Sequence, residues 1–202
     1  MNYQELSIKN LKKTDKKLYN LLNKEYKYDL VIFVARGAYL IGRDFSEFNN
    51  CPLLEIKASR SGGKLKKLLR PILCLIPEKL KLYLRKKELN SNVHKENNER
   101  NVMFDEEKYK ENKKAKKILL VDDSIDTGYT IKSAKEAIEN FFKGATVKVA
   151  VLNYFDKAKD VFTPDYYLHK DTILKGPWSN DSKENKKYLK MYYKWRDEEN
   201  VR

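Results

Sequence analysis

One short segment, Ile118–Thr130 (ILLVDDSIDTGYT), combines residue types that could bind a cation and a phosphate together. Its acids are Asp122, Asp123 and Asp126, and its small and hydroxyl residues are Thr127, Gly128 and Thr130. Carboxylates hold divalent cations and accept hydrogen bonds from hydroxyl groups. Backbone N–H groups at the start of a helix bind phosphate, and a glycine lets the backbone come close. Because acids repel phosphate, the segment predicts a ligand that also carries a diol and a divalent cation.

Three apolar runs predict the strands that position this segment: Leu30–Ala35, Ile118–Val121 and Thr146–Leu152. Apolar residues recur at helical spacing over Ile131–Phe141, and Gly144 ends that helix before the third run. The order strand, helix, strand predicts an α/β fold with a mainly parallel central sheet flanked by helices. Ligands of such sheets bind outside the C-terminal strand ends, so we expect the acid pair in a surface loop there.

The segment Ile118–Thr130 resembles the 5-phosphoribosyl-1-pyrophosphate (PRPP) motif of the type I phosphoribosyltransferases. The resemblance implies that Asp122 and Asp123 bind the ribose hydroxyls and Mg²⁺, and that Asp126 is the catalytic acid–base group near the acceptor nitrogen. It implies a 5′-phosphate site made by Thr127, Gly128, Tyr129 and Thr130. Tyr129 departs from the family, which often has a small residue there. The alternative interpretation is a solvated acidic turn with a helix N-cap.

A second segment, Arg36-Gly37, follows the apolar run Leu30–Ala35 and precedes an apolar helix. It resembles the pyrophosphate loop of the same family, which contains a non-proline cis peptide. The resemblance implies that Arg36 and Gly37 bind the pyrophosphate group of PRPP. An ordinary surface arginine at a strand end is the alternative interpretation of Arg36.

The C-terminal stretch, with PDYY at 164–167 and PW at 177–178, resembles the hood of the bacterial 6-oxopurine phosphoribosyltransferases. These enzymes act on xanthine, guanine or hypoxanthine, and the resemblance implies a base-covering segment at about 163–202. Ile173 lies where the family has an aromatic residue that stacks on the purine. Asn153 lies where the family has a lysine that binds the 6-oxo group. Both are candidate base-binding residues, and both departures leave the acceptor open.

The chain has 202 residues, which predicts a single domain over 1–202, and a formal net charge of +14. Most of that charge lies at about 57–117, which we interpret as a basic helical insertion with two short helices over 64–89. Arg60 and Lys64 flank its Ser-Gly-Gly start and are candidate pyrophosphate ligands. The insertion could pack on the core, form a subunit interface, or bind an anionic macromolecule or a membrane surface.

Two cysteines, Cys51 and Cys74, exclude a disulfide framework, and two histidines, His94 and His169, exclude a His-rich metal site. We expect both cysteines to be buried or half-buried thiols in a reducing, cytoplasmic compartment. The chain shows neither a secretory signal at its N-terminus nor an apolar run long enough to cross a membrane.

Three functional hypotheses follow. The first is a Mg²⁺-dependent phosphoribosyltransferase that transfers the ribose 5-phosphate group of PRPP to a base, with a 6-oxopurine favoured, and works as a homo-oligomer. The second is a non-catalytic regulator that senses PRPP or a nucleotide and binds nucleic acid through the basic insertion. The third is a phosphoribosyltransferase with a non-purine acceptor.

Overall fold

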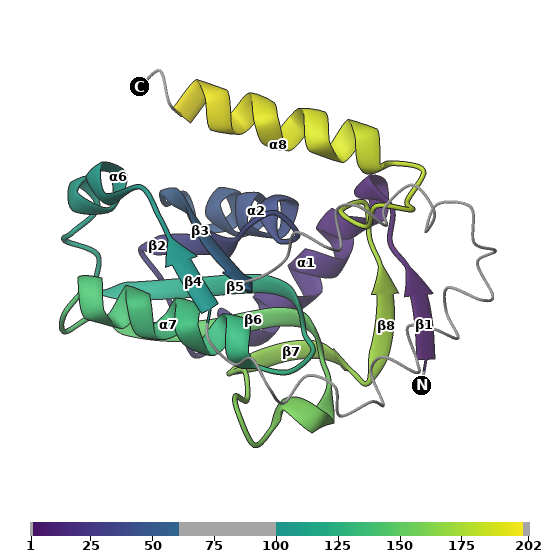
Figure 1. The fold of residues 1–202 in the computed structure, drawn as a ribbon, viewed down its shortest axis with the longest axis horizontal. Helices are drawn as coiled ribbons and strands as arrows, with labels where there is room; N and C mark the ends of the chain where they lie inside the picture. The colour runs from purple at the N-terminus through teal and green to yellow at the C-terminus, as the bar shows by residue number, and fades with distance from the viewer. Residues whose placement is uncertain (1, 61–99, 200–202) are drawn as a thin grey trace.

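A six-stranded sheet forms the centre of the molecule (Figure 1), and the computed structural model describes residues 2–60 and 100–199. The strands are β2 (Leu30–Val34), β3 (Leu53–Arg60), β4 (Arg100–Met103), β5 (Lys117–Ile125), β6 (Thr146–Tyr154) and β7 (Tyr166–Lys170). Their order is β4-β3-β2-β5-β6-β7, and every pairing is parallel except that of β4 with β3. The predicted mainly parallel sheet and its three predicted strands are therefore confirmed.

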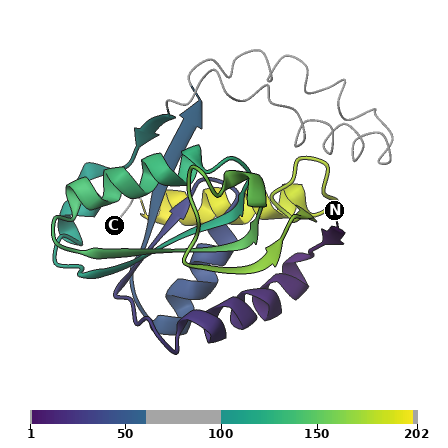
Figure 2. The same cartoon turned by 90° about the horizontal axis from the view of Figure 1, so that it is seen from below.

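Helices cover both faces of this sheet (Figure 2). They are α1 (Ile8–Leu22), α2 (Tyr39–Asn49), α6 (Glu106–Glu111), α7 (Tyr129–Phe141) and α8 (Asn185–Glu199). Alternate residues of β2 serve the two layers: Val31 and Phe33 pack with α1, α2 and α8, whereas Leu30 and Ile32 pack with α6 and α7. Because both faces are buried, the strand has the continuous apolar sequence from which it was predicted.

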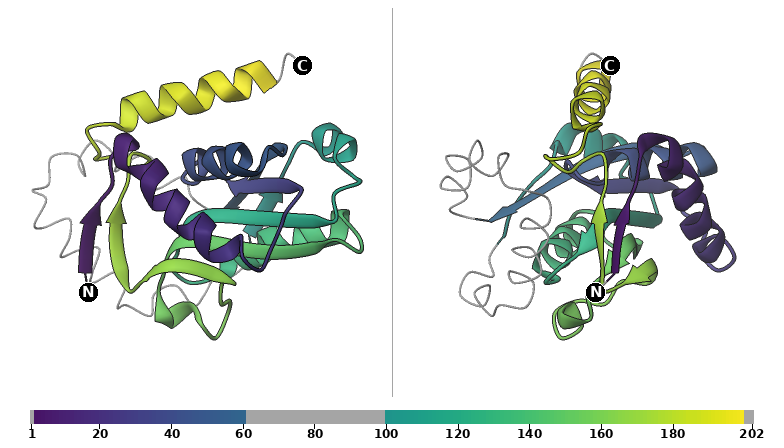
Figure 3. Two further views of the ribbon diagram at one scale, coloured as in Figure 1. Left: turned by 180° about the vertical axis from the view of Figure 1, so that it is seen from behind. Right: turned by 90° about the vertical axis from the view of Figure 1, so that its right-hand side faces the viewer.

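A separate two-stranded parallel sheet pairs the N-terminal strand with a strand of the predicted hood (Figure 3). It contains β1 (Asn2–Glu5) and β8 (Thr172–Lys175), with Tyr3 opposite Ile173. The Leu6 N–H extends the pairing with a hydrogen bond to the Lys175 carbonyl at 2.9 Å. The sequence places this C-terminal region in a hood, but the N-terminal strand that completes the sheet was not predicted.

The acid pair lies inside a strand and not in a loop after it, so the predicted surface loop is wrong for these two residues. Strand β5 runs on past Val121 to Ile125, because β6 continues beside it: Asp122 pairs with Val151 and Ser124 with Asn153. Asp122 is only 8% exposed. The shorter strand was predicted because acids usually end an apolar run, whereas here the neighbouring strand carries the pairing through them.

The described ends of the predicted insertion belong to the body of the fold. Strands β3 and β4 pair antiparallel from Lys57↔Met103 to Arg60↔Arg100, and α6 buries Tyr109 in the core. The predicted helices over 64–89 lie outside the described residues. The same holds for Lys64, Cys74 and His94, and for the side chain of Arg60. Cys51 is half-buried, as expected. Within residues 2–60 and 100–199, no helix has the length and apolar character needed to cross a membrane.

Candidate active site

The buried acid pair is the centre of the site. The backbone N–H of Asp123 donates to Oδ1 of Asp122 at 2.9 Å. Burial raises the pKa of the Asp122 carboxyl well above its ordinary value, and the neighbouring charge of Asp123 raises this pKa further. An ionised Asp122 is therefore costly in this protein alone. A cation or a pair of hydroxyl groups from a ligand would offset that cost.

The donor set at this position fits Mg²⁺ shared with a phosphorylated ligand. Among the described residues, no group of three or more His, Cys, Asp or Glu side chains could enclose a metal ion. Magnesium, however, is commonly held by one or two carboxylates together with substrate phosphates and water. Asp122 and Asp123 are residues of this kind, so they could hold Mg²⁺ that arrives with its ligand.

The turn after β5 leads directly into the N-terminus of α7. Gly128 is the N-cap residue with φ 85°, and as a glycine it has no side chain with which to cap this helix end. The N–H groups of the first turn are therefore suited to a phosphate. A Cβ on residue 128 would lie 3.1 Å from the backbone nitrogen of Phe162, so both the backbone conformation and the packing require glycine. Thr127 and Thr130 are half-buried beside it.

Asp126 lies at the start of this turn and is half-buried. The hydroxyl of Ser124 donates to Oδ1 of Asp126 at 3.4 Å. The carboxyl therefore lies between the acid pair and the N-terminus of α7 in the chain, where a group acting on bound PRPP is expected. Its catalytic role stays a prediction.

Arg100, the first residue of β4, contacts the predicted phosphate loop. Its Nε donates to Oγ1 of Thr130 at 3.4 Å, and its guanidinium lies over the Tyr129 ring, 5.7 Å from the centroid. Tyr129, the departure from the family motif, thus faces a cation. Arg100 is not predicted from the sequence, because its only signal there is its position in a segment rich in basic residues.

The loop after β2 comes close to the acid pair. The Ala35–Arg36 peptide is cis, as the resemblance to the pyrophosphate loop implies. A Cβ on residue 37 would lie 2.5 Å from Oδ1 of Asp123, so any larger residue here would have to displace the Asp123 carboxyl group. The structure therefore brings together Gly37 and Asp123, which are far apart in the sequence. The Arg36 Nη1 donates to the Tyr193 hydroxyl of α8 at 3.0 Å.

The predicted base-binding residues Asn153 and Ile173 are both buried. Asn153 is fully buried: its Nδ2 donates to the Ser124 hydroxyl at 3.1 Å, and its Oδ1 accepts from the Thr172 N–H at 3.0 Å. Ile173 packs against Phe155. The Asn153 amide therefore ties β5 to the start of β8, which favours a positioning role, and contact of either residue with a base stays a prediction.

A cavity of about 460 Å³ lies away from these residues, between β3, β4, α6 and α8. Its charged lining includes Glu55 and Lys57, which pair at 3.2 Å, and its aromatic lining includes Tyr109 and Trp195. None of the described residues predicted to bind PRPP lines it. The candidate site is therefore the place where the end of β5, the loop after β2 and the start of α7 converge, and not this cavity.

Comparison with known proteins identifies the family. The sequence matches the phosphoribosyl transferase domain over residues 4–179. The chain belongs to this family. The predicted resemblance and the predicted class of enzyme, a phosphoribosyltransferase, are therefore confirmed. A comparison with curated proteins gives no match.

Solved structures with the same fold are distant in sequence. Xanthine-guanine-hypoxanthine phosphoribosyltransferase from Helicobacter pylori is 15% identical, with a TM-score of 0.62, and the match covers 92% of this chain and 99% of that one. Purine phosphoribosyltransferase from Pyrococcus horikoshii is 19% identical, with a TM-score of 0.56 and coverage of 89% and 96%. A hypothetical protein from Neisseria gonorrhoeae with bound ppGpp is 18% identical, with a TM-score of 0.59 and coverage of 96% and 97%. At these identities the likeness establishes the fold alone.

Proposed function

We propose that the protein catalyses the Mg²⁺-dependent transfer of the ribose 5-phosphate group of PRPP to a 6-oxopurine and releases pyrophosphate. The observation that carries the proposal is the contact between Gly37 and Asp123. It joins the predicted pyrophosphate loop to the predicted ribose and cation site. Helix α7 begins at Tyr129, six residues after Asp123 in the chain. One ligand with a pyrophosphate, a diol and a 5′-phosphate satisfies all three parts.

The chain's own residues bind and orient the ligand in this proposal. Asp122 and Asp123 accept hydrogen bonds from the ribose hydroxyls, and the first turn of α7 binds the 5′-phosphate with Thr127 and Thr130. Mg²⁺, when bound, neutralises charge on the pyrophosphate leaving group. A ring nitrogen of the base forms the new bond to C1 of the ribose, while the bond from C1 to pyrophosphate breaks and its electron pair leaves with pyrophosphate. Asp126 accepts the proton that the base loses.

The acceptor is the finer part of the proposal. Two of the solved structures above are named as enzymes of purines or of xanthine, guanine and hypoxanthine, which supports a purine. Ile173 is buried and apolar, which suits the face of a base, although it lacks an aromatic ring.

The test is release of pyrophosphate from PRPP and Mg²⁺ with guanine, xanthine, hypoxanthine, adenine or uracil, and with no base. We expect release with at least one 6-oxopurine and none without a base. Release with adenine or uracil alone would retain the transferase and contradict the acceptor. Binding of PRPP without release under any condition would contradict catalysis and favour the PRPP-sensing regulator.

One observation favours a nucleotide-sensing role as the second candidate. The Neisseria gonorrhoeae protein of the same fold has ppGpp bound, and ppGpp carries two pyrophosphate groups. The same assay with added ppGpp distinguishes the two: competition with PRPP would indicate binding at the proposed site, and unchanged release would remove the support for this candidate.

A further inference from the structure

The last helix of the described chain, α8, lies against the predicted pyrophosphate loop. The Tyr188 side chain is completely buried, and its hydroxyl contacts two backbone carbonyl oxygens, those of Arg36 and Gly37, the second at 2.9 Å. Helix α8 runs along one side of the molecule above α2 (Figures 1 and 3). Tyr188 thus joins the helix to the backbone of the loop itself.

This contact helps to fix which way the loop's peptide groups point, together with the hydrogen bond from the Tyr39 N–H to the Arg36 carbonyl at 3.2 Å. The Arg36–Gly37 peptide is trans, since Ala35–Arg36 is the single cis bond among the described residues. In a trans peptide the N–H points opposite to the C=O. Because the Arg36 carbonyl points at Tyr188, the Gly37 N–H points away from α8. A backbone donor directed away from the covering helix is what a pyrophosphate ligand on the open side of the loop requires.

The same helix also holds the side chain of the loop's arginine. The Tyr193 hydroxyl accepts from Nη1 of Arg36 at 3.0 Å, and the Arg196 guanidinium lies over the Tyr193 ring, 5.0 Å from its centroid. Helix α8 therefore holds the loop at two independent points. Tyr188 holds its backbone, and Tyr193 holds its guanidinium.

Packing with the core holds α8 in place. The Trp195 ring lies 5.2 Å from the Phe33 ring and 5.4 Å from the Tyr39 ring, measured between centroids. The hydroxyl of Tyr192 donates to the Glu55 carboxylate on β3. Strand β2 precedes the loop and α2 follows it, so α8 is fixed to both elements that carry the loop.

We propose that α8 is the positioning element of the pyrophosphate subsite, with Tyr188 as the positioning residue for the loop backbone and Tyr193 for Arg36. The proposal rests on the proposed function, because it assigns to Tyr188 the orientation of a loop that binds PRPP. In this proposal both tyrosines act through the loop and not by contact with the ligand. Loss of either hydroxyl is expected to weaken binding of the pyrophosphate group and to leave binding of the base unchanged.

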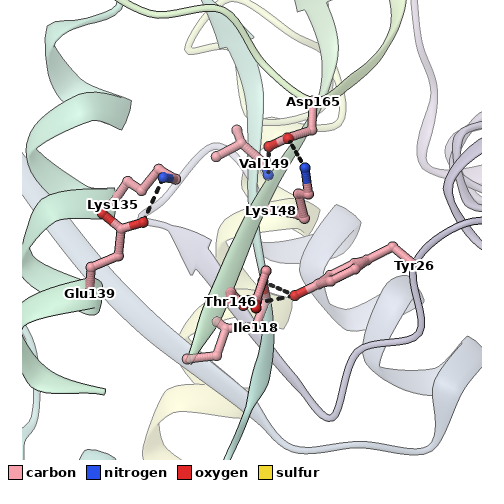
Figure 4. A network of polar contacts seen from close by, with 8 residues as sticks. All are labelled: Tyr26, Ile118, Lys135, Glu139, Thr146, Lys148, Val149 and Asp165. Carbon is pink, nitrogen blue, oxygen red and sulfur yellow. Dashed lines mark hydrogen bonds and ion pairs between the residues drawn. The ribbon is translucent and has the colours of Figure 1, made fainter. Parts of the chain in front are cut away.

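The chain offers a matched control for Tyr188 at the opposite end of the sheet. The Tyr26 hydroxyl also faces two backbone carbonyl oxygens, those of Ile118 at 3.2 Å and Thr146 at 2.8 Å, and its side chain is buried (Figure 4). These carbonyls lie where β5 and β6 begin, far along the strands from the loop. Tyr26→Phe therefore removes the same kind of hydrogen bond without touching the site.

The experiment compares wild type, Tyr188→Phe and Tyr26→Phe for binding of Mg²⁺ with inorganic pyrophosphate and of Mg²⁺ with PRPP, and for KM and kcat. Misplacement of a binding group by a fraction of an ångström to 1 Å costs up to about 10²-fold. We expect Tyr188→Phe to raise the Kd of pyrophosphate and the KM of PRPP by roughly tenfold, with the KM of the base unchanged. Tyr26→Phe should lower the Tm and leave both ligand affinities as in wild type.

Equal pyrophosphate affinity in wild type and Tyr188→Phe would overturn this inference but not the proposed function. An equal loss of pyrophosphate affinity in Tyr188→Phe and Tyr26→Phe would do the same. A wild type that binds neither PRPP nor pyrophosphate overturns the proposed function as well, so the two failures are distinguishable. If Tyr188→Phe does not fold, Tyr193→Phe at the protein surface carries the test. A pyrophosphate Kd unchanged in Tyr193→Phe then overturns the proposal.

Discussion

The carboxylates at the two ends of the central sheet have different surroundings. Where the strands begin, Asp29 accepts hydrogen bonds from the backbone N–H groups of Lys116 and Lys117, both at 3.0 Å. Asp165 accepts from the Val149 N–H at 2.8 Å and pairs with Lys148 at 2.6 Å (Figure 4). Where the strands end, Asp122 is buried with Asp123 and Asp126 as its charged neighbours.

This difference separates structural acids from acids that serve a ligand. Each carboxylate at the first end is matched by donors within the protein, so it stabilises the fold without any ligand. At the second end, Asp122 is buried beside the charge of Asp123, which costs stability when Asp122 is ionised. A fold retains such a cluster where a ligand supplies the missing positive charge and hydroxyl groups.

The largest expected effect comes from Asp126→Ala, which should lower turnover by roughly 10²–10⁴-fold with PRPP affinity nearly unchanged. Asp29→Asn is its control at the other end of the sheet, and should cost about 1 kcal/mol of stability with turnover unchanged. Steady-state kinetics, PRPP binding and urea unfolding measure these effects. Equal losses of PRPP affinity and turnover in Asp126→Ala would make Asp126 a structural residue of the turn.

The next comparison is between two glycines with positive φ, Gly128 just before α7 and Gly144 shortly after it. Gly128 has φ 85° and close neighbours, whereas Gly144 has φ 82° and no atom within 4 Å of an added Cβ. A left-handed non-glycine residue costs about 1–2 kcal/mol, so Gly144→Ala should lose about that stability and Gly128→Ala at least as much. Only Gly128→Ala should also lose turnover, by roughly tenfold or more, because the phosphate loop must shift. Equal turnover in the two variants would contradict the phosphate site at Gly128.

The smallest expected effect concerns a second carboxyl pair, between α1 and α2. Asp15 is completely buried, and no donor among the described residues reaches either of its oxygens. Burial raises the pKa of Asp15 well above its ordinary value, and the nearby Asp44 raises it further, whereas Arg43 lowers it. Arg43 itself pairs with Asp44 at 3.1 Å. A proton on Asp15 would let its carboxyl group donate to Asp44.

Because the folded-state pKa of Asp15 is raised, its contribution to stability is complete below about pH 3.8 and is lost as pH rises through the folded-state pKa. Asp15→Asn is neutral at every pH. It should therefore be more stable than wild type at pH 7, by on the order of 1 kcal/mol, with a difference that shrinks as pH falls. Urea unfolding from pH 4 to pH 8 tests this. A difference that is independent of pH would mean that Asp15 is not the titrating group.

The sequence predicts three central strands of the sheet, β2, β5 and β6, and the segments of the site because their signals are local. Each predicted strand is a short run of mainly apolar residues, and the segment Ile118–Thr130 contains a strand end, a turn and a helix start in order. The same locality explains the error at Asp122. The residue looks like the end of a strand in the sequence, whereas pairing with Val151 on β6 keeps it in the sheet.

The contacts that the sequence does not predict are long-range and involve ordinary residue types. Tyr188 lies 152 residues from Arg36, and Arg100 lies 30 residues from Thr130. Tyrosines at helical spacing in α8 indicate a buried face, but their spacing carries no information on which hydroxyl reaches a carbonyl. The pairing of β1 with β8 likewise joins segments about 170 residues apart in the sequence, Asn2 opposite Thr172.

The most direct test of the central claim is the effect of PRPP and Mg²⁺ on thermal unfolding of wild type and of the Asp122→Asn, Asp123→Asn double variant. Without ligand, the double variant should be at least as stable as wild type, because it removes two repelling charges. Saturating wild type at 100 times the Kd should add about 2.7 kcal/mol of stability and raise its Tm. The double variant should lose most of this increase. A wild-type Tm that PRPP and Mg²⁺ leave unchanged, or an equal increase in the double variant, would contradict the account.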